Sequence, residues 1–191
     1  MSGLSWNISV SCAATFGRRY IETLRPDVFP GLEGFDEAAP CLTASSRNNF
    51  TEAVIARAVR EAGASGLEHL AKGFDPVNGK MLGAGPWATL IDGDDLRRVV
   101  SDTQSLFEAW RLDPARLVTA SRRDYAADDV LDALHCPATT VEEAIAAYDD
   151  CRARDDGDDL ACVVALLQAH AAMAWQAANH GQALFHFIWL Y

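Results

Sequence analysis

Apolar residues recur every three or four positions along much of this chain, which is the spacing of an amphipathic helix. The clearest stripe runs from Leu96 to Trp110, and Asp92 before it is a suitable N-cap residue. Thr140 and Glu143 form a capping box that predicts the start of another helix. The pattern predicts long helices over residues 50–62, 94–111, 141–151 and 160–180, and shorter helices over residues 17–24, 66–72, 115–120 and 126–135.

Three stretches have the pattern of strands. Apolar and polar residues alternate strictly over Leu4–Cys12, which predicts a half-buried strand. The runs 86–91 and 183–190 are short, apolar and contain β-branched or aromatic residues, so they predict a central and a C-terminal strand. These strands do not alternate with helices at the spacing of βαβ units. We therefore expect an α+β fold: a helix-rich single domain over 1–191, a small sheet of the N-terminal, central and C-terminal strands, and a long surface connection over 25–45.

The C-terminal region is unusually apolar. No Asp, Glu, Lys or Arg occurs from Leu160 to Tyr191. A membrane-spanning helix needs about 20 mostly apolar residues, but Gln168, His170 and Gln176 interrupt this run, so we expect a buried core helix and no membrane contact. The strand that follows is apolar on both faces, and a strand with one face in water alternates apolar with polar residues. We therefore expect it in the interior of the sheet, or with its second face covered by a helix or by another subunit.

The chain carries 16 basic and 27 acidic residues, a formal net charge of −11. This balance argues against a nucleic-acid partner, because backbone phosphates require a basic surface. Residues 124–159 hold twelve acids, opposed only by Arg152 and Arg154. Such a segment is either a solvated helical surface or a docking surface for a basic protein partner. The partner-binding residues that we expect there are Asp128, Asp129, Asp132, Asp149, Asp150, Asp155 and Asp156.

No motif for catalysis or metal binding is present in the sequence. The five histidines include no HExxH motif and no pair at i, i+4 spacing, so core or surface positions are expected for them. The five cysteines have no CxxC spacing, and their odd number favours reduced thiols over a disulfide framework. Two Asp-Gly-Asp-Asp-Leu repeats, at 92–96 and 156–160, lack the alternating oxygen ligands of a calcium loop and predict helix starts instead. We expect no metal, no cofactor and no catalytic residue.

Several short pieces of the C-terminal half share an order with a known family. They are Gly85-Pro86-x-x-x-Leu90, the helix from Asp94-Asp95-Leu96 to Phe107, and the ending Ala177-Ala178-x-x-Gly181-x-Ala183-Leu184. In this order the region from residue 85 to 191 resembles the YfbM-like family of uncharacterised bacterial proteins, which similarly ends in a helix, a Gly-containing turn and a last strand. The resemblance implies an α+β fold and no particular activity.

These observations favour a small acidic protein-binding protein of the immunity-protein or antitoxin type, which docks on a basic partner through residues 124–159. The N-terminal residues lack the positive charge and apolar run of a secretory signal, so a cytoplasmic location is expected. The alternative is a small enzyme with a site near residues 73–87, where Asp75 and Lys80 lie among glycines. A third interpretation is self-association through the aromatic C-terminus, which leaves a homo-oligomer open.

Overall fold

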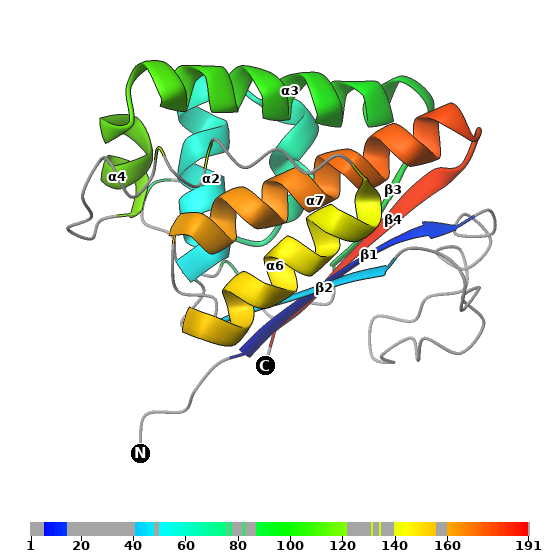
Figure 1. Ribbon diagram of the computed structural model, residues 1–191, viewed down its shortest axis with the longest axis horizontal. Helices are drawn as coiled ribbons and strands as arrows, with labels where there is room; N and C mark the ends of the chain where they lie inside the picture. The colour runs from blue at the N-terminus through cyan, green and yellow to red at the C-terminus, as the bar shows by residue number, and fades with distance from the viewer. Residues whose placement is uncertain are drawn as a thin grey trace.

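The computed structural model describes residues 6–14, 41–47, 50–75, 77, 82, 87–121, 131, 134, 140–155 and 160–190. Helices make up most of this part of the chain (Figure 1). In parts of this range, above all in the strands, only the backbone is described. The helices are α2 (Phe50–Ala62), the 3₁₀ helix η1 (Ser65–Ala71), α3 (Gly93–Leu112), α4 (Ala115–Ser121), α6 (Val141–Asp155) and α7 (Leu160–Asn179). The helix-rich α+β class expected from the sequence is confirmed.

Helix α3 shows how the sequence determines an element. Asp94 and Asp95 occupy its first turn, where carboxylates interact favourably with the helix dipole. The apolar stripe from Leu96 to Trp110 is buried, as its spacing predicts. Gly93, the first residue of the helix, has a φ of 54°, a conformation that favours glycine.

The predicted capping box begins helix α6. The backbone N–H of Glu143 donates to Thr140 Oγ1 over 3.1 Å, and the backbone N–H of Thr140 donates to Glu143 Oε2 over 3.2 Å. These reciprocal bonds satisfy two of the backbone donors that a helix start leaves unpaired. The helix therefore starts at Val141, directly after Thr140.

The strands are β1 (Trp6–Ala14), β2 (Cys41–Arg47), β3 (Trp87–Ile91) and β4 (Ala183–Leu190), in the order β2-β1-β4-β3. All three pairings are antiparallel, and His186 of β4 lies opposite Thr89 of β3. Strand β4 therefore lies between β1 and β3. The described helices gather on one face of this sheet in Figure 1.

Helix α7 is the central helix of the core. It packs against α6, α3 and the sheet, and its buried residues include Val163, Leu167 and Met173. By length and composition alone it could cross a membrane, but 67% of its most apolar window is buried inside the fold. Burial on several sides explains why this helix lacks a polar face.

One prediction needs correction. The surface connection expected over 25–45 ends earlier, because residues 41–45 belong to strand β2. The stretch Thr43–Arg47 is polar and carries no clear alternation, so its strand structure follows from pairing with β1 rather than from a local pattern. Residues 25–40, the helix expected over 17–24 and most of that expected over 126–135 lie outside the described residues.

Candidate functional site

Three histidines that are far apart in the sequence meet in the interior of the fold. His69 comes from η1, His170 from α7 and His186 from β4. Their side chains are 8%, 0% and 1% exposed. We call these three residues the histidine triad.

The rings of the triad are in direct contact. Nε2 of His69 lies 2.6 Å from Nε2 of His170. The ring centroids of His69 and His186 are 5.2 Å apart, and those of His170 and His186 are 5.7 Å apart. The His186 ring is nearly perpendicular to both others. Among the described residues, no group of three His, Cys, Asp or Glu side chains could hold a metal ion.

Burial keeps the triad neutral. Desolvation lowers the pKa of His69 to about 3 and holds the pKa values of His170 and His186 well below 6.5. The proximity of other positive groups, including Lys72 for His69 and His186, lowers these pKa values further. Charged imidazoles at this position would lose their hydration inside the core, so the folded protein favours three neutral rings.

The tautomer of His69 follows from its second hydrogen bond. A bond to the backbone of Gly66 raises the pKa of His69, so the ring donates its N–H to the Gly66 carbonyl. Since Nε2 faces His170, the donor is Nδ1. A neutral ring that is protonated on Nδ1 carries a lone pair on Nε2, which points into the triad.

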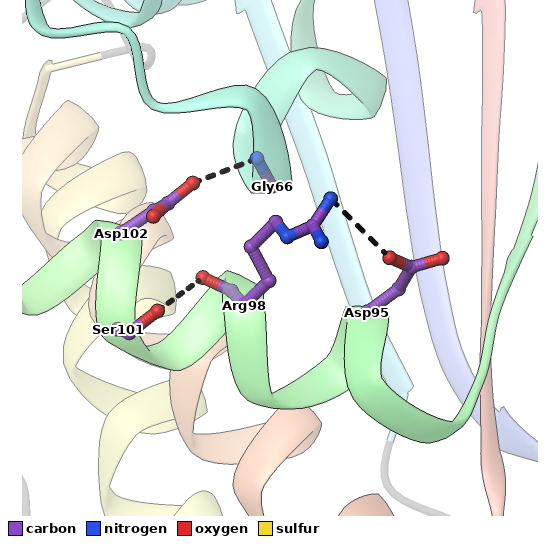
Figure 2. Close-up of polar contacts among 5 residues, drawn as sticks. All are labelled: Gly66, Asp95, Arg98, Ser101 and Asp102. Atoms are coloured by element: carbon purple, nitrogen blue, oxygen red, sulfur yellow. Dashed lines mark hydrogen bonds and ion pairs between the residues drawn. The ribbon is translucent and has the colours of Figure 1, made fainter.

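Gly66 positions η1, and with it His69, directly against helix α3 (Figure 2). A Cβ atom added at Gly66 would lie 2.9 Å from the backbone carbonyl carbon and oxygen of Arg98, so only glycine allows this approach. The backbone N–H of Gly66 donates to Oδ2 of Asp102 over 2.8 Å. Figure 2 shows Asp102 reaching from α3 to this N–H group, which attaches the start of η1 to the helix.

A cavity of about 790 Å³ adjoins the triad. Its walls come from α2, η1, the end of β3 and the first two turns of α3, and His69 is one of its lining residues. We call it the η1 pocket. Its volume lies within the range of sites that hold small molecules and cofactors, about 300–1,000 Å³.

The lining of the η1 pocket is more basic than the chain as a whole. Arg60, Lys72 and Arg98 line it, against the two acids Glu68 and Asp95. Arg98 and Asp95 form an ion pair of 3.7 Å, and both side chains are more than half exposed. Such an exposed pair contributes little energy, so Arg98 can exchange its partner for a ligand at small cost.

The alternative site near residues 73–87 overlaps only the edge of this pocket. Gly73 and Phe74 line it, but Asp75 instead closes a local turn, where its Oδ1 accepts the backbone N–H of Val77 over 2.7 Å. Lys80 lies outside the described residues. Most of the residues that line the pocket belong to other elements, and no sequence pattern links those elements to these glycines.

The expected partner-binding residues are described only in part. Asp149 and Asp150 are exposed on helix α6, and Asp149 pairs with Arg152 over 3.5 Å. Asp155 is the last residue of α6, and its side chain is not described. Asp128, Asp129, Asp132 and Asp156 lie outside the described residues.

Cys151 of α6 and Cys162 of α7 form a second buried side-chain pair. Both are free thiols, and their Sγ atoms lie 2.8 Å apart. Their contact joins the two helices on either side of residues 156–159.

Sequence reasoning missed the triad because its members are separated by long stretches of chain, 101 residues in the case of His69 and His170. One signal was present. His170 and His186 are polar residues inside an almost wholly apolar helix and strand, and buried polar groups need partners. Two such residues in neighbouring core elements indicate a buried polar contact, although they do not name the third member.

Comparison of the chain with protein-family models, with curated proteins and with solved structures found no match. The resemblance to the YfbM-like family therefore stays a prediction, and the functional argument depends on the geometry of the site itself.

Proposed function

We propose that the protein binds a small anionic molecule in the η1 pocket. The observation that carries this proposal is the presence of three basic side chains, Arg60, Lys72 and Arg98, around a cavity of about 790 Å³ in a chain of net charge −11. A locally basic cavity on an acidic protein concentrates anions at that place and repels them elsewhere. The preferred ligand class carries at least two negative charges, as in dicarboxylates and phosphate esters.

The arrangement of the basic groups supports this choice. Among the described residues Arg98 forms a weak ion pair with Asp95, and Lys72 Nζ contacts Thr89 Oγ1 over a long distance of 3.5 Å. Both side chains can therefore turn to a ligand without breaking a strong interaction. An arginine also offers two parallel N–H groups to a carboxylate or phosphate, which adds orientation to charge.

Calorimetric titration with pyrophosphate and with citrate tests the proposal. We expect one molecule of at least one of these anions to bind per chain. Arg98→Ala should weaken binding about tenfold, the loss of one charge-assisted contact. The matched control is Arg97→Ala, since Arg97 lies on the same turn of α3 but is not among the lining residues of the pocket.

Two results would contradict the proposal. One is a failure of both anions to bind at millimolar concentration. The other is binding that Arg98→Ala and Arg97→Ala weaken equally, because that pattern indicates general charge attraction rather than the η1 pocket.

A second candidate is docking of a basic protein partner on helix α6, the function expected from the sequence. It is favoured by one observation: Glu142, Glu143, Asp149 and Asp150 are all exposed on this helix. Charge complementarity of this kind mainly increases the rate of association and selects the partner. The proposal keeps residues 124–159 as the partner-binding segment.

Charge reversal separates this candidate from the first. Substitution of Asp149 and Asp150 by lysine should slow association with a basic partner protein, as measured by surface plasmon resonance at low salt. The control reverses Asp94 and Asp95, which are exposed acids in the first turn of α3. Equal association rates for the two variants would reject α6 as the docking surface.

We further propose that the sheet predicted from the N-terminal, central and C-terminal strands supports the η1 pocket. Strand β3 contributes Thr89, Leu90 and Ile91 to the pocket and pairs with β4. The pairing of β4 with β1 on its other side would hold β3 in place at the edge of the sheet. Slow amide exchange along Trp6–Ala14 would support this role, and exchange at the rate of an unfolded peptide would reject it.

A further inference from the structure

The lining of the η1 pocket divides by exposure into an apolar floor and a basic rim. Among the described lining residues, the floor consists of buried apolar side chains: Ala56, Val59, Ala71, Phe74 and Ile91. The rim carries the three basic side chains Arg60, Lys72 and Arg98, which are exposed. A ligand that fills the pocket therefore meets positive charge at the rim and apolar atoms beneath it.

The volume of the pocket is larger than a small anion alone would fill. Pyrophosphate has nine heavy atoms, and at about 30 Å³ each, the share of one molecule in liquid water, it would occupy about 270 Å³. The cavity holds about 790 Å³. An anion that also carries an apolar body would use the remaining space and displace water from the floor, which is favourable.

We propose that the ligand of the η1 pocket is a phosphate monoester with an apolar body, whose phosphate lies at the basic rim and whose body lies on the apolar floor. This inference rests on the proposed function and names the ligand class of the same site. A phosphate monoester carries about 1.5 to 2 negative charges at pH 7 on one compact group. A compact group suits this rim, because an extended polyanion would also meet the lining acids Glu68 and Asp95.

The packing of Arg98 prepares its guanidinium for a phosphate (Figure 2). Its Cγ lies so close to Gly66 that a Cβ atom added there would be 2.9 Å from it. The side chain is nevertheless more than half exposed, and its guanidinium pairs with Asp95 over 3.7 Å. Because the stem is packed and the charged end is in solvent, Arg98 can offer two parallel N–H groups to a phosphate with little loss of side-chain freedom.

The floor is continuous with the hydrophobic core. Val59 of α2, Ile91 of β3 and Phe74 all belong to the core cluster. Ile91 is also paired in the sheet, opposite Leu184 of β4. Side chains packed in this way keep their positions, so the apolar body of a ligand would bind a surface that is already formed.

Calorimetric titration with methyl, hexyl and 1-naphthyl phosphate, three esters that carry the same charged group, tests the proposal. We expect hexyl or 1-naphthyl phosphate to bind at least about tenfold more tightly than methyl phosphate, the gain from burial of about two CH₂ groups. The two larger esters distinguish a flexible alkyl body from a flat aromatic one.

A variant of the floor separates the apolar body from the charged group. Val59→Thr replaces a methyl group of the floor by a hydroxyl group of similar size. It should reduce the advantage of the tighter large ester about threefold and leave the affinity for methyl phosphate unchanged. The matched control is Val54→Thr, which changes a buried valine of the same helix that is not among the lining residues and should keep the advantage.

NMR spectra of the wild-type protein with ¹³C-labelled methyl groups give an answer even if Val59→Thr fails to fold. The tighter large ester should shift the methyl signals of Val59 and Ile91, and methyl phosphate should leave them in place. Unshifted methyl signals, equal affinities for the three esters, or equal losses in the two valine variants would overturn the inference.

Failure of the inference is distinguishable from failure of the proposed function. If all three esters bind equally and Arg98→Ala weakens each of them, the anion site stands and the apolar body is rejected. If 1-naphthyl phosphate binds no more tightly than uncharged 1-naphthol, both the anion site and the inference are rejected.

Discussion

Gly66→Ala is the single substitution that most directly tests how η1 is attached to α3. The added Cβ would lie 2.9 Å from the carbonyl carbon, the carbonyl oxygen and Cγ of Arg98. Ordinary van der Waals contacts of a Cβ atom begin at 3.4 Å. Two of the three neighbours are backbone atoms of the long helix α3, so η1 itself must move away by about half an ångström.

The cost follows from this displacement. Overpacking of this kind destabilises a protein by about 1–3 kcal/mol. Movement of η1 also lengthens the 2.8 Å bond from Gly66 N–H to Asp102, which is worth about 1.5–3 kcal/mol because its acceptor is charged. The greater helix propensity of alanine offsets up to about 1 kcal/mol of this loss of stability. We therefore expect Gly66→Ala to lower the free energy of unfolding by about 1.5–5 kcal/mol.

Urea titrations followed by tryptophan fluorescence measure this loss. Ser65→Ala is the matched control, because Ser65 is an exposed neighbour on the same 3₁₀ helix. If the displacement breaks the bond to Asp102, then Asp102→Ala should cost less in the Gly66→Ala background than in wild type. A Gly66→Ala protein within about 0.5 kcal/mol of the stability of wild type would refute the close approach.

Three further predictions follow from other contacts. Burial lowers the pKa values of the triad, so the unfolded chain binds more protons than the folded protein below about pH 6.5. The free energy of unfolding should therefore fall by about 1.4 kcal/mol per triad histidine from about pH 7.5 to about pH 5.5. Denaturant titrations at both pH values, with His180→Gln as the exposed control, measure this change, and equal stability at both would contradict it. Diamide, a two-electron oxidant, should oxidise Cys151 and Cys162 to a disulfide with loss of two hydrogens. Mass spectrometry after treatment with an alkylating reagent should then find neither sulfur alkylated. Thr140→Ala should destabilise the protein by about 1 kcal/mol through loss of the capping box, whereas Thr140→Ser should keep most of the stability.

The elements that the sequence predicts well are those determined by local pattern. Helix α2 has the predicted bounds, and α3 and α7 agree to within about two residues, because their apolar spacing and end residues lie within a few turns of chain. Strand β2 was not predicted, since its polar residues take strand structure from the neighbour that they pair with. A local sequence pattern carries no information on which distant strand a segment will pair with.

The candidate site, in contrast, is built from separated parts. The triad joins η1, α7 and β4, and the η1 pocket joins α2, η1, β3 and α3. No spacing rule connects these elements before the fold is known. Gly66 illustrates the limit: the sequence shows a glycine near a short helix, and only the structure shows that the backbone of Arg98 lies against it.

A ligand that binds in the η1 pocket should change the surroundings of the backbone amides that line it. The most direct measurement is a titration of the ¹⁵N-labelled protein with pyrophosphate, with amide chemical shifts followed residue by residue. We expect shifts that cluster in η1, at the end of β3 and in the first turns of α3, with Gly66, Leu90 and Arg98 among them. Shifts confined to other parts of the chain, or no shifts at millimolar pyrophosphate, would contradict the claim.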